Sequence, residues 1–459
     1  MQTSKGCIIL AAGDGKRMKS EKPKVLMEVL FKPMLEWVLD AVSAAGIEDT
    51  AAIIGNNAEL LEGYLKNEPN VQIFHQTQRK GTGHAVMQAE SFLAKLKEAD
   101  GDVLILCGDA PFMDSETIEG AYDCHKSQNN DVTVITADIT QPANYGRILR
   151  NGERLEGIVE EKDCTDEQRK INEINSGGYW FKVAALLDAL PKLTTENKSG
   201  EYYLTDAVGL TGNAGAFKTT NQRVVLGAND RRGLRELNKT AAQITIERHL
   251  DNGADIIGDN VLIGADVVIG KDTVIMPGTI IRGETVIGGG GVIGPNSLIA
   301  DCEIGDNVTL NNVHAFLSKI EDNVKVGPFV HIRPDSVLKN GVKIGDFVEV
   351  KNSVIGEKTA IAHLTYIGDS DVGRGVNFGC GCVTANYDGL KKYRTTIGND
   401  AFIGCNTNLI APVKIGDNAM TAAGSTVSTE VPANSLAIER GRLNIKENYD
   451  KNLKRKKKS

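Results

Sequence analysis

The sequence of 459 residues lacks several features that would each define a class of protein. Its eight cysteines include no CxxC pair, so we expect neither a disulfide framework nor a zinc site. No apolar run approaches the length of a membrane span, and the N-terminal segment MQTSKGCIILAAG lacks the layout of a signal peptide. These absences predict reduced thiols and a cytoplasmic protein.

An excess of positive charge is also missing. The net charge of −8 argues against broad electrostatic binding to nucleic acid. The basic tail at residues 451–459 is the exception, and we interpret it as a solvated segment. Because a typical domain has about 100–150 residues, a chain of this length is expected to form two or more domains.

What the sequence has in excess is glycine, with 49 residues, and a regular isoleucine repeat. Isoleucine occupies every sixth position from 257 to 299, and apolar residues resume the period after slips at 304–310, 326–350, 355–367 and 397–415. A period of six fits neither a strand nor a helix alone, but it fits a short strand and a corner, repeated. Segment 255–431 is therefore predicted to be a parallel β-helix, with glycines such as Gly258, Gly264, Gly270, Gly288 and Gly294 permitting tight or positive-φ corners.

Three hexads per coil and about 4.8 Å between stacked strands predict roughly ten coils in a prism about 45–50 Å long. The repeat alone is equally consistent with a scaffold and with an enzyme. Between residues 312 and 394 the register fails and polar residues replace the regular pattern. A scaffold has no need of them.

The first half of the chain has the pattern of an α/β domain. Residues 6–13, GCIILAAG, predict a strand that enters a glycine turn, and further strands are expected at 50–55, 71–75, 102–107 and 131–137. Such alternation predicts a mainly parallel sheet with helices on both faces, whose ligands bind beyond the carboxyl ends of the strands. Helical spacing at 230–250 then predicts one helix that joins domain 1–229 to domain 251–459.

The turn after the first strand has the composition of a phosphate-binding loop. Gly13 and Gly15 let backbone N–H groups approach a polyphosphate, while Arg17 and Lys24 supply positive charge. The string LAAGDGKRMKSEKPKVL resembles the signature of the sugar-nucleotidylyltransferases, with Lys16 where that family generally has Thr. Asp109 in Gly-Asp-Ala-Pro resembles the family's metal ligand, although an isolated Asp at a strand end is more often a turn residue; Asn229 is the implied second ligand of Mg²⁺.

Three more strings resemble the bacterial N-acetylglucosamine-1-phosphate uridylyltransferases: QTQRKGTGHA, NYGRI with VEEKD, and EINSGGYW. The resemblance implies in-line attack of a sugar-1-phosphate on the α-phosphorus of UTP, helped by Mg²⁺, Arg17 and Lys24 without a protein nucleophile. It implies that uracil meets Gln76, Gly81 and Thr82, and that the N-acetyl sugar meets Gly146, Glu160 and Asn175. The implied nucleotide site also includes Leu10, Ala11, Ala12, Gly13, Lys24 and Asn229.

The second half resembles the hexapeptide-repeat acyltransferases, whose fold is a left-handed parallel β-helix. HIRPDSVL, GDFVEVKNS, AHLTYIGD and TANYDG resemble the acetyltransferase half of the same bifunctional enzyme. This implies that His363 is the general base for the glucosamine amine, that Glu349 orients it, and that Asn386 stabilises developing charge. The implied contacts of glucosamine-1-phosphate are Arg333, Lys351, Tyr366, Asn377 and Lys392. The implied contacts of acetyl-CoA are Cys380, Asn386, Tyr387, Cys405, Ala423 and Arg440.

Two of these positions depart from the most familiar members, which commonly have Ala and Ser where this chain has Cys380 and Cys405. Small residues are kept, so acetyl-CoA binding is expected to survive, and Cys405 becomes a candidate thiol-reactive group.

The leading interpretation is a bifunctional enzyme that acetylates glucosamine-1-phosphate and then forms UDP-N-acetylglucosamine, with no nucleic-acid or membrane partner. The resemblance further implies a homotrimer with acetyl-transfer sites between subunits. One alternative keeps only nucleotidyl transfer and gives the β-helix a regulatory or oligomerising role, but it does not account for His363, Lys351 and Asn386. Another is a non-catalytic guanine-exchange subunit, which predicts loss of Arg17, Lys24 or Asp109, and all three are present.

Overall fold

The structure is a computed structural model that describes residues 4–13, 15–55, 59–142, 144–152, 154–447 and 449. The side chain of Lys16 and the basic tail at 451–459 lie outside the described residues. The chain forms two compact units, Met1–Ala241 and Ala242–Ser459, and the division falls within helix α8 (Arg231–Asp251). No described helix is both long and apolar enough to cross a membrane.

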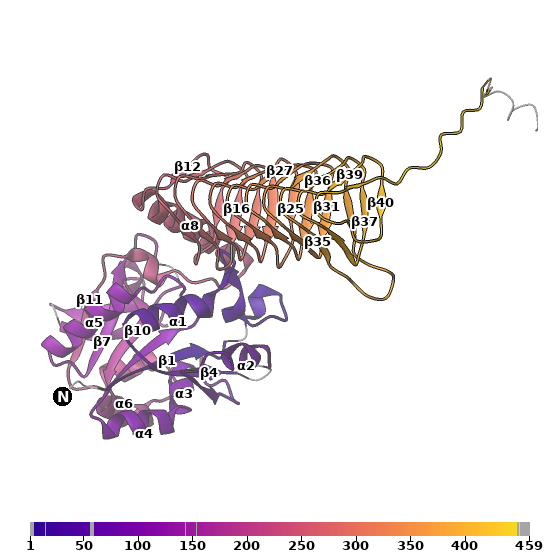
Figure 1. Ribbon diagram of the computed structural model, residues 1–459. Coiled ribbons are helices and arrows are strands. Elements are labelled where there is room, and N and C mark those ends of the chain that lie inside the picture. The colour runs from indigo at the N-terminus through magenta and orange to yellow at the C-terminus, as the bar shows by residue number, and fades with distance from the viewer. Residues whose placement is uncertain are drawn as a thin grey trace, which may run out of the picture. The chain divides into compact units, whose positions relative to one another are not determined.

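The first unit is built on one nine-stranded sheet whose main path runs β11-β7-β10-β6-β1-β4-β5 (Figure 1). Strands were predicted at five places in this unit, and strands are present at all five. The bounds are β1 (Lys5–Ala11), β4 (Asp49–Ile54), β5 (Val71–His75), β6 (Asp102–Cys107), β7 (Val132–Asp138), β8 (Arg147–Asn151), β9 (Arg154–Val159), β10 (Glu173–Lys182) and β11 (Ala214–Lys218). A separate small pair consists of β2 (Glu28–Val29) and β3 (Lys32–Pro33).

Helices cover both faces of this sheet, as predicted. In β1, Cys7, Ile9 and Ala11 point to one hydrophobic core and Ile8 points to the other, because successive side chains of a strand alternate. The first core is completed by α1 (Met34–Ala44), α2 (Glu59–Leu65) and α5 (Ser115–Ser127). The second is completed by α3 (Thr82–Met87), α4 (Glu90–Glu98), α6 (Val183–Ala189) and α7 (Leu204–Gly209).

Strand β10 departs from the expected parallel arrangement, since it lies antiparallel between β6 and β7. Its register shifts between Asn175 and Tyr179, and within this bulge Gly177 has a φ of +81°. A side chain at Gly178 would press on Ile135, Leu106 and Met113. The two glycines therefore let a strand bend within the sheet, and the bulge presents Asn175 near the carboxyl end of β7, opposite Thr136.

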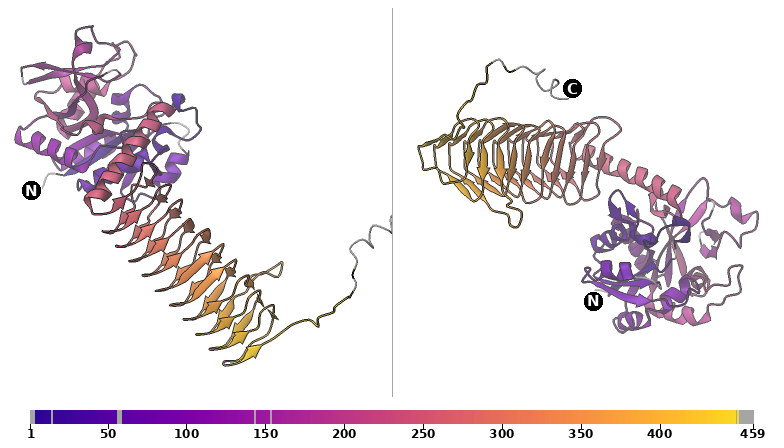
Figure 2. Two further views of the ribbon diagram at one scale, coloured as in Figure 1. Left: turned by 90° about the horizontal axis from the view of Figure 1, so that it is seen from above. Right: turned by 90° about the vertical axis from the view of Figure 1, so that its right-hand side faces the viewer.

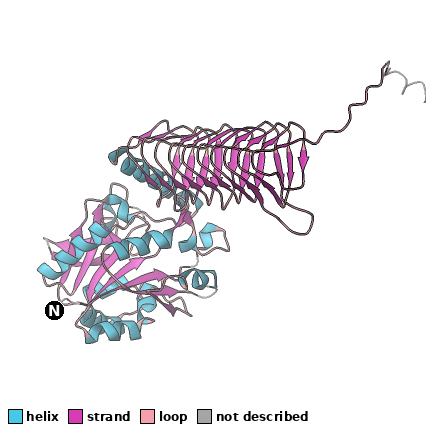
Figure 3. Ribbon diagram, viewed as in Figure 1, coloured by secondary structure: helices cyan, strands magenta, loops and turns pink. Residues whose placement is uncertain are grey.

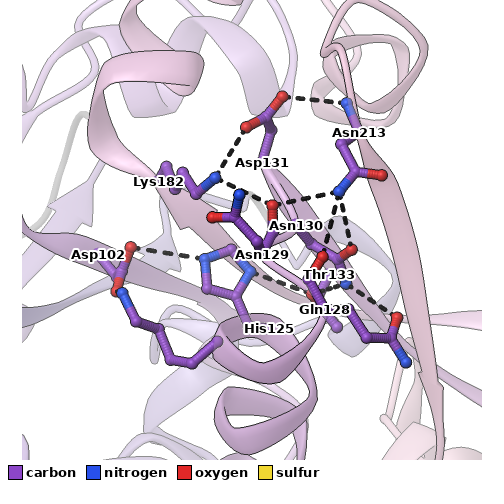
Figure 4. A network of polar contacts seen from close by, with 10 residues as sticks. Asp102, His125, Gln128, Asn129, Asn130, Asp131, Thr133, Lys182 and Asn213 are labelled. Atoms are coloured by element: carbon purple, nitrogen blue, oxygen red, sulfur yellow. Dashed lines mark hydrogen bonds and ion pairs between the residues drawn. The ribbon is translucent and has the colours of Figure 1, made fainter.

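A buried polar network fixes the opposite edge of the sheet (Figure 4). His125 is fully buried; its Nδ1 lies 3.0 Å from Thr133 Oγ1 and its Nε2 lies 3.5 Å from Asp102 Oδ1. Burial raises the pKa of Asp102, but hydrogen bonds from His125 and Lys126 outweigh it and hold the pKa below its usual value. These contacts join α5 to the first residues of β6 and β7, so they lie at the opposite ends of these strands from their carboxyl ends.

The second unit is a prism of stacked coils with three parallel sheets of 11, 10 and 9 strands (Figure 2). Each strand pairs with the third strand along the chain, except that β39 (Met420–Thr421) pairs with β41. After α8, its described elements are strands and loops (Figure 3). The strands run from β12 (Asp255–Ile256) to β41 (Leu436–Ala437) and are two to four residues long. The predicted number of coils, about ten, is therefore confirmed.

The isoleucine repeat forms the core of the prism. Its members from Ile263 to Ile415 are buried, including Ile332 and Ile361, which have no exposed surface. The prediction that Ile257 begins this buried series is wrong, because its side chain is 41% exposed. Strand β12 pairs Ile256 with Ile275, so the first coil is one residue out of phase with the others.

The corner glycines act in two ways. Gly258 has a φ of +83°, as expected for a left-handed corner. Gly270 does not have a positive φ. A Cβ on Gly270 would instead lie 2.6 Å from the backbone of Gly288 in the next coil. Close approach between coils, and not only positive φ, therefore explains the glycine excess.

Ile332 and Ile257 provide a test of which isoleucines form the core of the prism. Ile332→Ala removes buried atoms from a packed coil and is expected to lower the free energy of unfolding by about 2–5 kcal/mol. Ile257→Ala, the matched control at an exposed position, should change it by less than about 0.5 kcal/mol. Denaturant unfolding followed by circular dichroism measures both. Equal losses would contradict the described phase of the first coil.

Candidate active sites

The first unit contains a cavity of about 270 Å³ at the carboxyl ends of β1 and β6. The chain runs from β1 to β4 and β5 on one side and then returns to β6 on the other, so the cavity lies at the point where the strand order reverses. Eight of the residues predicted for the nucleotide site line it: Leu10, Ala12, Gly13, Lys24, Gln76, Gly81, Thr82 and Asp109.

Three predicted residues meet around one ammonium group. Lys24, in the 3-10 turn η2 (Lys24–Leu26), forms an ion pair with Asp109, and its Nζ donates a 2.8 Å hydrogen bond to Asn229 Oδ1. Carboxylate and amide oxygens that both reach one cation fit the oxygen ligation of Mg²⁺, with waters and phosphate oxygens completing the coordination. Among the described residues no group of three or more His, Cys, Asp or Glu could hold a metal.

The predicted phosphate-binding loop has two different glycines. Gly15 has a φ of +55°, and a Cβ there would lie 2.8 Å from Lys24 Cβ, so this residue must be small for Lys24 to pack. A Cβ at Gly13 would meet nothing within 4 Å. The space beside Gly13 belongs to the cavity, which is consistent with backbone approach to a bound phosphate.

Gln76 is buried and its amide is held in place. Its Nε2 donates to Gly81 O at 3.0 Å and lies 3.1 Å from His84 Nδ1. Gly81 has a φ of +103°, and Thr82 Oγ1 accepts a hydrogen bond from the backbone of Leu204. A fixed amide beside a glycine turn can recognise the polar edge of a base.

The residues predicted to face the sugar lie around β8, β9 and β10. Asn175 N donates to Gly146 O at 2.9 Å, and Asn175 Oδ1 accepts from Gly177 N. Burial raises the pKa of Glu160, which Thr205 Oγ1 partly offsets by donating a 3.1 Å hydrogen bond to its carboxylate. A half-buried carboxylate with spare acceptor capacity suits recognition of hydroxyl or amide donors.

Six of the predicted residues are not among those that line the cavity: Gly146, Glu160, Asn175 and Asn229, described above, and Ala11 and Arg17. Ala11 is buried in the core of the sheet, and Arg17 is exposed in the turn η1 (Lys16–Met18), where its charge lowers the pKa of Asp230 after the larger effect of hydrogen bonds from Gly233. Conversely, Arg79 and Glu201 line the cavity and were missed. Arg79 lies within the same string as Gln76 and Gly81, which was the available signal.

On the prism, the predicted phosphate contacts form one cationic cluster. The ammonium of Lys392 lies against Lys351 and is the main reason that the pKa of Lys351 falls below its usual value; burial and the charge of Arg333 act in the same direction. Arg333 follows β25 (Val330–Ile332), and Lys351 ends β28 (Glu349–Lys351), the next strand of the same sheet. Three neighbouring cations of this kind fit a dianionic phosphate.

Asp369 faces this cluster. Burial raises its pKa, but hydrogen bonds from Asn352 and Asn386 and the charges of Lys351 and Lys392 bring the pKa below its usual value. Asn386 is buried and donates its amide to Asp369, so it holds that carboxylate in place.

His363 pairs with a carboxylate other than the predicted Glu349. Its Nδ1 lies 2.7 Å from Asp346 Oδ1, and the hydrogen bond holds the pKa of Asp346 below its usual value. Asp346 is the register partner of His363 between β27 (Lys343–Asp346) and β30 (Ala360–His363). Glu349 instead accepts a 2.8 Å hydrogen bond from Arg333 and is the register partner of Tyr366.

Predicted acetyl-CoA contacts stack along one edge of the prism, between the 11-stranded and 10-stranded sheets. Gly381 N donates to His363 O, Asn406 N to Cys380 O, and Gly424 N to Cys405 O, so each coil adds one residue to the column. Arg440 Nε extends it by donating to Ala423 O. We call this column, which consists of His363, Cys380, Cys405 and Ala423, the edge column.

Tyr387 and Lys392 lie in an outward loop between β34 (Val383–Ala385) and β35 (Thr395–Ile397), visible in orange in Figure 1. Tyr387 is exposed, with its hydroxyl bonded to Gly389 O. Asn377, in β33 (Asn377–Phe378), is exposed on the sheet that also carries His363.

A second cavity, of about 640 Å³, borders the same edge. Its lining includes Glu349 and Tyr366 with three large apolar residues, Phe329, Phe347 and Leu364, each more than half exposed. All three have positive φ, between 47° and 59°, at the corner position that other coils fill with Asn296, Asn312, Gly381, Asn406 and Gly424. We call Phe329, Phe347 and Leu364 the apolar ridge.

These features define a transferase in which a nucleotidyl transferase unit precedes hexapeptide repeats. The nucleotidyl transferase family matches residues 6–221, and the bacterial transferase hexapeptide (six repeats) family matches residues 318–352 and 394–429. The bifunctional protein GlmU of Acetivibrio thermocellus is 47% identical over 448 residues, 96% of each chain. Those of Clostridium acetobutylicum and Streptococcus mutans are 46% and 43% identical over 450 residues, covering 97% of this chain and 98% and 97% of theirs.

The chain therefore belongs to the family of the bifunctional protein GlmU. This confirms the resemblance drawn from the sequence motifs, and with it the α/β nucleotidyltransferase domain and the left-handed parallel β-helix.

Glu160 generates a prediction about stability. Because its pKa is raised in the folded protein, its effect on stability is most favourable below the pKa of the unfolded carboxyl, about 4.3, and is lost as the pH rises through the folded pKa. Glu160→Gln keeps an acceptor for Thr205 without the half-buried charge. We expect the variant to be more stable than the original protein at pH 7–8 and to lose that advantage near pH 4. Thermal unfolding across this range measures the difference, and an advantage that grows toward acid would contradict the assignment.

Proposed function

We propose that this chain makes UDP-N-acetylglucosamine in two steps. Unit 251–459 transfers an acetyl group from acetyl-CoA to glucosamine-1-phosphate, and unit 1–229 transfers a uridylyl group from UTP to the N-acetylated product, releasing pyrophosphate; helix 230–250 joins them. The observation that carries the proposal is that each unit has positive charge for a phosphate: the ammonium of Lys24 in the first unit, and the cluster of Lys351, Lys392 and Arg333 in the second. The second unit also has the pair of His363 and Asp346.

In the uridylyl step, the loop at Gly13 and the ammonium of Lys24 hold the phosphates of UTP, with Arg17 contributing charge from its exposed turn. Asp109 and Asn229 would hold Mg²⁺, which when bound neutralises charge on the phosphate oxygens. Gln76, Gly81 and Thr82 position uracil. Gly146, Glu160 and Asn175 position the sugar so that its phosphate oxygen attacks in line.

In the acetyl step, His363 is the base. The ionised Asp346 can only accept a hydrogen bond, so Nδ1 of His363 carries the proton and Nε2 keeps its lone pair. Nε2 takes a proton from the glucosamine amine as the amine attacks the thioester carbonyl, and the CoA thiolate leaves. Arg333, Lys351 and Lys392 hold the sugar phosphate with Tyr366 and Asn377, while acetyl-CoA lies along the edge column toward Arg440, near Tyr387.

The two activities should separate by mutation in the full chain. His363→Ala is expected to lower acetyl transfer by about 10²–10⁴-fold, because it removes the base, and to leave uridylyl transfer intact. Asp109→Ala should lower uridylyl transfer by at least about 10²-fold and spare acetyl transfer. Release of CoA thiol and of pyrophosphate measure the two steps. If His363→Ala left acetyl transfer unchanged, the reading of the β-helix as an enzyme would fail.

We further propose a homotrimer in which a second copy covers the apolar ridge. Phe329 and Phe347 stack with ring centroids 5.4 Å apart. Non-glycine residues in this left-handed conformation cost about 1–3 kcal/mol each, and other coils avoid the cost with Asn or Gly. Three large apolar side chains that are both strained and exposed support burial against another subunit.

Phe347→Asn separates the two effects. Asn accepts positive φ more readily, so the isolated subunit should be no less stable, whereas the trimer should dissociate at a higher concentration. Analytical ultracentrifugation measures the assembly. Val268→Asn, at an exposed position away from the ridge, is the matched control. A Phe347→Asn protein that stays as fully trimeric as the control contradicts the proposed interface.

A further inference from the structure

Two cysteines of the edge column lie on neighbouring coils at the same register position. Strand β33 pairs with β36 (Phe402–Ile403), with Asn377 opposite Phe402 and Phe378 opposite Ile403. The same offset of 25 residues carries past the strands, where Asn406 N donates to Cys380 O at 2.8 Å. Cys380 and Cys405 are therefore direct neighbours across one strand spacing.

That spacing matches a disulfide. Neighbouring strands lie about 4.7–4.9 Å apart, within the range of about 4.4–6.8 Å for the Cα atoms of bridged cysteines. A Cβ on Gly379 would lie 2.5 Å from Cys405 N and 2.8 Å from both its Cα and its Sγ, so the glycine beside Cys380 lets the coil of Cys405 approach closely. Both cysteines are reduced, Cys405 is exposed, and Cys380 is partly exposed.

A third cysteine nearby has a different environment. Cys382 is buried, and its Sγ lies 3.1 Å from both Gly379 O and Gly404 O. Burial raises its pKa to about 11, so it is almost entirely a thiol at neutral pH. It is a structural residue of the same corner and an internal reference for the exposed pair.

We propose that Cys380 and Cys405 form a reversible disulfide that switches off acetyl transfer. The effect on activity rests on the proposed function, whereas the formation of the bond does not. Segment 381–404 between the cysteines contains the outward loop with Asn386, Tyr387 and Lys392, so the bond ties together both ends of that coil. It also draws two sulfurs to about 2.05 Å between His363 and Ala423, in the proposed path of acetyl-CoA.

The oxidant is a low-molecular-weight disulfide. The thiolate of Cys405, the more exposed of the pair, attacks one sulfur of the reagent; the reagent's S–S bond breaks and one thiolate leaves. Cys380 then attacks the protein-side sulfur of the mixed disulfide and releases the second thiolate. The protein loses two electrons and two protons, and the reagent takes up both as two thiols. Excess dithiol reverses the exchange.

Oxidised glutathione tests the proposal on the full chain. Peptide mapping without reduction should reveal a peptide linked through Cys380 and Cys405, with Cys382 still free. Acetyl transfer should fall by about tenfold or more, equivalent to about 1.4 kcal/mol, and dithiothreitol should restore it. Uridylyl transfer should not change. Cys380→Ala and Cys405→Ser should lose this response when each is compared with its own reduced form, and Cys124→Ser, whose residue lies in α5, should keep it.

Each contrary outcome has a distinct meaning. A stable glutathione adduct on Cys405 without a cross-link would overturn the pairing of the two cysteines. A cross-link with unchanged acetyl transfer would overturn the switch. If the fully reduced chain had no acetyl transfer although the cross-link formed, the proposed function would fail and the disulfide would stand.

Discussion

The parallel stacking of coils, one strand spacing apart, is the constraint on which the second unit depends. Each coil donates backbone hydrogen bonds to its neighbour, so residues 16 to 25 positions apart along the chain become direct contacts. This stacking brings His363 to Asp346 and Lys351 to the coil of Arg333. It also lines up the edge column. A regular hydrogen-bonded ladder is thus the means by which separate short strings form one site.

In the first unit, the nine-stranded sheet likewise brings residues that are far apart in the chain to one place. Its parallel strands end at one edge of the sheet, and Lys24, Asp109 and Asn229 converge there. The buried contacts of His125 and Asp102 hold the other edge. Because one edge is fixed by polar contacts within the protein, charged groups at the opposite edge remain available to a ligand.

Sequence reasoning found most of the fold because hydrophobic period and strand-end residues are local signals. It failed where the register between strands decides which side chains contact each other. Glu349 is 14 residues before His363, but the coil that contains them repeats after 17, which selects Asp346. The antiparallel setting of β10 was missed for a related reason, since its direction is set by its pairing with β6 and β7, which lie far along the chain. The apolar ridge was missed because large side chains at a corner look like ordinary core residues in a sequence.

The sequence by itself determined the six-residue repeat, the glycine turn after the first strand and the family, because each depends on residues close together in the chain. Only the tertiary structure decided which carboxylate meets His363, which apolar residues lie outside the core, and that Cys380 faces Cys405. The physical reason is that coil length varies with every slip and loop. Contacts across coils are set by the backbone hydrogen bonds of the folded prism and not by the spacing of residues along the chain.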